Sequence, residues 1–215
     1  MDFMKLIKSL EEFLYELMVW LVFYPRTMVL AVFRPLKLMQ YADTELGDAD
    51  EDRYSDTLSP PIFLAITLGL LHAIEMAGDL DTGYSGLLSD DETLIAFRLI
   101  AFAIFPLMFS LRLLRANKVV LDRKTLRSPF YAQCFAVGPF ALGIDAASIL
   151  DGFKFGPVVT FATMGVSLLW YLTVQVLWFR VQRSQGVFRA TGNTLRAFLE
   201  GLFAVAVLAG IVESI

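Results

Sequence analysis

Five stretches of the chain consist almost wholly of apolar residues and are separated by short polar connections. A helix needs about 20 mostly apolar residues to cross roughly 30 Å of hydrocarbon at 1.5 Å per residue. The stretches that meet this requirement are residues 61–78, 93–114, 129–150, 157–179 and 194–214. A backbone in lipid must pair its own polar groups, so each stretch is expected to be a helix. The pattern therefore predicts an all-α integral membrane protein whose residues 61–215 form a bundle of five transmembrane helices.

Three of these stretches begin at a proline, namely Pro61, Pro129 and Pro157. The first turn of a helix accepts proline because the N–H group at that position has no partner within the helix. We therefore expect each of these prolines to open its helix.

The first 42 residues carry a different, amphipathic pattern that precedes the five stretches. The charged residues Lys5, Lys8, Glu11, Glu12 and Glu16 lie on one side of a helix. The opposite side is apolar and comprises Phe3, Leu6, Ile7, Leu10, Phe13, Leu14, Leu17, Met18 and Leu21. Such a helix lies in the headgroup layer with its apolar side buried in the membrane.

The amphipathic region is expected to bend at Pro25-Arg26 and to continue as a second apolar arm, residues 28–33, that ends at Arg34-Pro35. We interpret residues 1–42 as an interfacial elbow. The alternative is a sixth span over residues 13–33, which would place Pro25 and Arg26 deep in hydrocarbon. Residues 43–60 follow as an acidic linker, with seven acids against Arg53 between positions 43 and 56.

Composition and charge support a membrane location and predict an orientation. Hydrophobic residues make up 57% of the chain, too many for a soluble domain of this size. Lys and Arg gather before the first stretch and in the connections after the second and fourth, whereas the other two connections hold only Lys154. Cytoplasmic loops carry the positive charge. We therefore expect a multi-pass protein of a bacterial-type inner membrane, with its N-terminus in the cytoplasm and its C-terminus outside.

Four ionisable residues within the predicted spans share one depth. His72, Glu75, Arg98 and Asp145 all lie about 4–9 Å from the outer ends of their helices at 1.5 Å per residue. Ionisable groups in spans are expensive and often functional. One interpretation is a binding site or ion pathway in which Arg98 holds a carboxylate ionised and His72 exchanges a proton. The other is that Arg98 pairs with Glu75 or Asp145 to hold three helices together.

A second polar level is predicted near the cytoplasm. Gln175 and Glu200 lie at similar depths in the fourth and fifth spans, and Arg196 is placed one helical turn before Glu200. These residues are secondary candidates, since both side chains are shallow enough to reach water.

The residue inventory argues against catalysis and against bound metals or other cofactors. The chain has one His and one Cys, Cys134, which we expect to be a buried small hydrophobe. A faint calcium-loop pattern at Asp79, Asp81 and Gly83 lacks a complete ligand series. The basic connection after the second stretch meets anionic lipid rather than nucleic acid. We therefore expect no enzyme, no cofactor and no nucleic-acid partner.

The layout resembles that of the Yip family, whose members have a cytoplasmic region followed by five closely spaced spans. The resemblance lies in Tyr24-Pro25-Arg26, Phe33-Arg34-Pro35 and the acidic linker that leads to Ser59-Pro60-Pro61. It implies a non-enzymatic protein that organises membrane lipid or partner proteins. The alternative function is a small transporter or channel for ions, protons or lipid that uses the outer polar residues. Membrane lipid is the expected partner, together with a second copy or another membrane protein.

Overall fold

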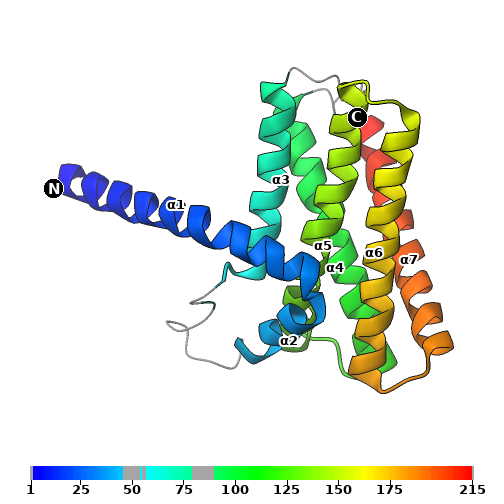
Figure 1. The fold of residues 1–215 in the computed structure, drawn as a ribbon. Coiled ribbons are helices and arrows are strands. Elements are labelled where there is room, and N and C mark those ends of the chain that lie inside the picture. Colours follow the sequence, from blue (N-terminus) through cyan, green and yellow to red (C-terminus); the bar gives the residue numbers. More distant parts are fainter. Residues whose placement is uncertain (1, 46–53, 55–56, 79–89, 215) are drawn as a thin grey trace.

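The structure is a computed structural model that describes residues 2–45, 54, 57–78 and 90–214. Within these residues it is all-helical. The helices are α1 (Asp2–Phe33), α2 (Pro35–Glu45), α3 (Pro60–Ala77), α4 (Asp91–Ala116), α5 (Arg123–Gly152), α6 (Pro157–Arg183) and α7 (Val187–Glu213). Helices α3 to α7 stand side by side as a bundle. Helix α1 lies at a large angle to them and projects away from the bundle (Figure 1). The all-α prediction is correct.

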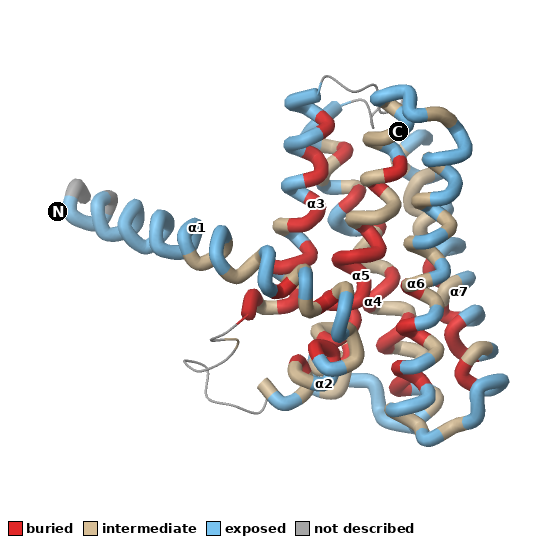
Figure 2. The backbone as a smooth tube through the Cα atoms, viewed as in Figure 1, coloured by how far each residue is buried: buried red, intermediate tan, exposed pale blue. Residues whose placement is uncertain are grey.

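Six helices are long and apolar enough to cross a membrane, judged by length and composition: α3 to α7 and the Ile7–Phe33 part of α1. The candidate in α1 differs from the others in its setting. It lies outside the bundle for most of its length and is almost entirely exposed in its first half (Figure 2). The number of spans therefore depends on how α1 is interpreted.

The prediction of a bend at Pro25-Arg26 is wrong. Helix α1 continues through Pro25 to Phe33, and the chain bends instead at Arg34. Helical geometry is unfavourable for the residue before a proline, which here is Arg34. Helix α1 therefore ends before Arg34, and Pro35 opens α2. Of the expected linker, positions 43–45 belong to α2 and Pro60 opens α3, while 46–53 and 55–56 lie outside the described residues, as do Asp79, Asp81 and Gly83.

Proline positions follow the prediction at two helices and depart from it at a third. Pro157 opens α6, and α3 has prolines in its first turn. Pro129 lies inside α5, which begins earlier because Asp122 caps it. The Asp122 carboxylate accepts hydrogen bonds from the backbone N–H groups of Lys124 and Thr125, both at 2.7 Å. This capping box starts α5 at Arg123.

Helix α5 is the centre of the bundle and contacts α1, α2, α3, α4 and α6. Its residues 132–141 are all buried (Figure 2). Close contact with α6 depends on Gly143, because a Cβ atom there would overlap the Ser167 side chain. Farther in, the Phe140 and Tyr171 rings stack with their centroids 4.5 Å apart. Small and aromatic side chains thus set how closely these helices approach.

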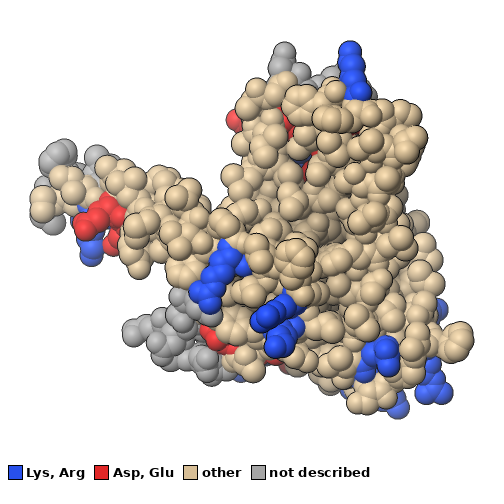
Figure 3. Space-filling model, viewed as in Figure 1, with Lys and Arg blue, Asp and Glu red and all other residues tan. Residues whose placement is uncertain are grey.

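The connections α4–α5 and α6–α7 lie at one end of the bundle, which we call the basic end. Lys and Arg side chains gather there and over the junction of α1 and α2 (Figure 3). The α5–α6 connection, with Lys154, and the end of α7 lie at the opposite end (Figure 1). This separation matches the charge alternation of the sequence.

Candidate functional site

Three bundle helices bury the four ionisable residues that the depth argument grouped. His72 and Glu75 come from α3, Arg98 from α4 and Asp145 from α5, and each is at most 8% exposed. His72 and Glu75 are three residues apart, so both face the bundle from one side of α3. We call these residues the outer polar cluster.

Arg98 and Glu75 form a buried ion pair, with 2.5 Å between Nη1 of Arg98 and Oε2 of Glu75. This is the first of the two pairings that the sequence suggested. This charge-assisted contact links α3 and α4, two helices that otherwise touch little. The pair accounts for one acid and one base of the cluster.

Asp145 lies within electrostatic range of both Arg98 and Glu75. Within the part of the chain that the structure describes, its Oδ2 atom is buried and accepts no hydrogen bond. The Nδ1 atom of His72 is likewise buried without a partner there. A purely structural cluster satisfies its buried polar atoms. These two atoms could therefore form hydrogen bonds with a small polar ligand.

The secondary candidates Gln175 and Glu200 have different partners. Gln175 on α6 forms a reciprocal amide pair with Gln133 on α5, at 3.0 and 2.5 Å, and both residues are fully buried. Glu200 is partly exposed and lies 3.9 Å from Arg196, the neighbour expected one turn away. These two candidates therefore take part in separate contacts, one a buried contact between helices and the other a partly exposed ion pair. Gln133 was missed, although a polar residue inside a predicted span was a signal for it.

A further polar contact attaches α2 to the bundle and could not be predicted from the sequence. The Asp43 carboxylate accepts hydrogen bonds from the Ser128 hydroxyl of α5 and, at 3.3 Å, from the Gln182 amide of α6. Burial raises the pKa of Asp43 above its usual value, and these two hydrogen bonds offset part of that rise. The contact holds α2 against the basic end (Figure 1).

Among the described residues, no group of three or more His, Cys, Asp and Glu side chains is placed to bind a metal ion. Cys134 is buried in the core.

Comparison of the chain with protein-family models, with curated proteins and with solved structures gave no match. The resemblance to the Yip family therefore stays a prediction from the layout of the sequence.

Proposed function

We propose that this chain is a non-enzymatic, multi-pass membrane protein that organises lipid through α1, in keeping with the role implied by its Yip-like layout. In this proposal α3 to α7 cross a cell inner membrane, with the basic end and the N-terminus in the cytoplasm and the C-terminus outside. Helix α1 lies along the cytoplasmic headgroup layer. The observation that carries the proposal is an apolar stripe on α1 that extends beyond the bundle.

The stripe starts where α1 contacts the bundle. Trp20 and Tyr24 pack against the core, Thr27 and Ala31 are buried, and the Tyr24 hydroxyl donates to Thr67 of α3 at 3.3 Å. These contacts recur at three- and four-residue steps, which is one face of a helix.

The same spacing continues into the free half of α1. Leu17, Phe13 and Leu10 prolong the face, but their side chains are 39%, 53% and 56% exposed. Fully burying such a side chain contributes about 1.5–3 kcal/mol, so three of them contribute several kcal/mol. An apolar face of this size on a membrane protein needs a cover, and lipid is the cover nearest to it.

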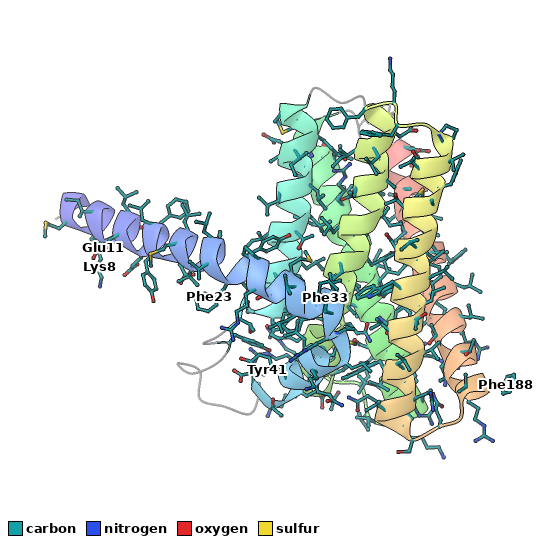
Figure 4. The ribbon with its side chains drawn as sticks, in the orientation of Figure 1. Lys8, Glu11, Phe23, Phe33, Tyr41 and Phe188 are labelled. Carbon is teal, nitrogen blue, oxygen red and sulfur yellow. The ribbon has the colours of Figure 1, made fainter. Side chains whose placement is uncertain are left out.

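The charged face of α1 favours a place in the headgroup layer over a sixth membrane span. Lys8 and Glu12 form an exposed ion pair at 3.8 Å. Figure 4 shows Lys8 and Glu11 on the side of α1 that looks toward the basic end, whereas Phe23 lies where α1 reaches the bundle. A spanning helix over residues 13–33 would take Glu16 and Arg26 into hydrocarbon, while an interfacial helix leaves the charged face in water.

Vesicle deformation tests the proposal. The full chain is reconstituted into vesicles as wild type, as Leu10→Ser/Phe13→Ser/Leu17→Ser and as the control Lys8→Ser/Glu12→Ser, which keeps the net charge. Wild type and control should tubulate or shrink the vesicles seen by electron microscopy, and the triple variant should leave them spherical. Equal deformation by the triple variant refutes the role of the stripe. Loss of self-association in that variant without any change in lipid shape would identify a second copy as its cover.

A second candidate function is favoured by the unpartnered atoms of Asp145 and His72. A transporter or channel needs a buried group that binds and releases its ion or proton. Proteoliposome flux measured for wild type, Asp145→Asn and the control Glu200→Gln tests this function. Ion or proton movement that Asp145→Asn alone abolishes would support it. Absence of movement under every gradient would remove it.

A further inference from the structure

The bend between α1 and α2 forms a pocket of about 240 Å³. We call it the junction pocket. It is lined by Leu30, Arg34, Lys37, Leu38, Tyr41 and Thr57. Residues 57 and 58 are held beside α1, because the Leu58 N–H donates to Oγ1 of Thr27 at 3.3 Å. The pocket is therefore built from α1, α2 and the segment that leads into α3.

Two cations line one part of the junction pocket, and none of its lining residues that the structure describes is acidic. In the part of the chain that the structure describes, neither Arg34 nor Lys37 forms an ion pair. They are three residues apart across the bend, so both reach the same pocket. A guanidinium and an ammonium side by side attract a phosphate group.

Thr57 is an independent indication of a ligand. Its side chain is only 5% exposed, and its hydroxyl oxygen has no hydrogen-bond partner among the described residues. A buried hydroxyl is nearly always hydrogen-bonded in a folded protein. In the junction pocket this hydroxyl lies ready to donate to an oxygen of a bound anion.

The remaining lining is apolar and favours an amphiphile over a soluble anion. Leu30 and Leu38 provide hydrocarbon, and Tyr41, labelled on α2 in Figure 4, provides a ring. Lys and Arg side chains gather over this junction (Figure 3). A ligand with a phosphate at one end and hydrocarbon at the other matches both parts of the lining.

We propose that the junction pocket binds one anionic phospholipid, whose phosphate is held by Arg34, Lys37 and Thr57 and whose glycerol and first acyl carbons pack on Leu30 and Leu38. This inference rests on the membrane layout proposed above and goes beyond it. The stripe of α1 needs only an apolar layer, whereas the pocket recognises a headgroup and selects among lipids by charge.

Lipid retention by the full chain in detergent tests the pocket. The probes are phosphatidylglycerol and phosphatidylcholine, and the readouts are the number of lipids retained in native mass spectrometry and the midpoint of thermal unfolding. Wild type should retain one phosphatidylglycerol in preference to phosphatidylcholine and should be stabilised by it. Arg34→Gln/Lys37→Gln should bind it about twenty-five-fold more weakly, since each cation near an anionic lipid contributes about a five-fold gain in affinity.

A matched control removes one Arg and one Lys elsewhere near the basic end. Arg123 and Lys124 are exposed in the first turn of α5 and lie outside the junction pocket. Arg123→Gln/Lys124→Gln should keep the retained lipid, and Thr57→Val should weaken its binding without changing the net charge. Equal loss in the control would show general surface attraction and overturn the proposal. Retention by Arg34→Gln/Lys37→Gln would overturn it as well.

Two further measurements distinguish a bound phospholipid from a free anion and from the role of the α1 stripe. Inorganic phosphate that stabilises wild type as well as phosphatidylglycerol does would make the occupant a free anion, and the lipid assignment would be wrong. The triple stripe variant should bind phosphatidylglycerol in detergent like wild type. If the pocket variant binds normally while the stripe variant fails to deform vesicles, only the junction pocket is refuted.

Discussion

Removing both acids of the outer polar cluster should destabilise the protein more than removing its arginine does. The change is Glu75→Gln/Asp145→Asn, compared with Arg98→Met. In the first variant a guanidinium that is 5% exposed loses the carboxylate at 2.5 Å and the second one within electrostatic range. A guanidinium cannot neutralise itself by losing a proton. A carboxyl group stranded by Arg98→Met neutralises itself by taking one up.

The magnitudes follow from this asymmetry. Breaking a buried pair so that a charge is left unpaired costs about 3 kcal/mol or more. Leaving a neutral buried polar group unpaired costs about 1–3 kcal/mol. For a chain of this length, 1 kcal/mol shifts the thermal midpoint by about 2–4 °C, so the double variant should unfold roughly 10 °C below wild type. The thermal midpoint of Arg98→Met should lie between those of wild type and the double variant.

Thermal unfolding in detergent, followed by tryptophan fluorescence, measures the difference. The control is Glu200→Gln, since Glu200 is partly exposed and its contact with Arg196 is long, at 3.9 Å. An exposed pair of this kind contributes about 0.5 kcal/mol. Unchanged stability of the double variant would show that Arg98 is satisfied without its acids. The depth argument that grouped these residues would then be wrong.

Three further predictions concern topology, the buried amide pair and Asp43. A reporter fused after Ile215 should be active outside the cytoplasm and one inserted near Asn117 inside it; a cytoplasmic C-terminus contradicts the five-span layout. Gln175→Leu should cost about 1–3 kcal/mol because Gln133 is left unpaired, and a second change of Gln133 to Leu should restore part of it. A double-mutant cycle in detergent checks this, and simple additivity contradicts it. Burial raises the pKa of Asp43 in the folded chain above its unfolded value, so the folded state binds the proton more tightly. The free energy of unfolding of wild type should therefore fall relative to that of Asp43→Asn as the pH rises above about 4, the unfolded value; a difference that is constant with pH contradicts the assignment.

The sequence by itself determined the helical character of the chain and the position of each buried charge along its helix. Both are properties of single segments, because a segment in lipid pairs its backbone internally and its rise per residue converts position into depth. The outer polar cluster could thus be grouped before any packing was known. The Arg98 pairing with Glu75 was one of two that depth allowed.

Only the tertiary structure decided which side chains meet. The choice of Glu75 over Asp145 as the direct partner depends on the rotation of α3, α4 and α5 about their axes. Those rotations follow from packing, such as Phe140 on Tyr171, which joins residues far apart in the chain. The junction pocket likewise depends on the bend at Arg34 and on how Thr57 is placed beside it. Contacts between distant segments are set by the shape of the whole bundle, and no local pattern in the sequence encodes them.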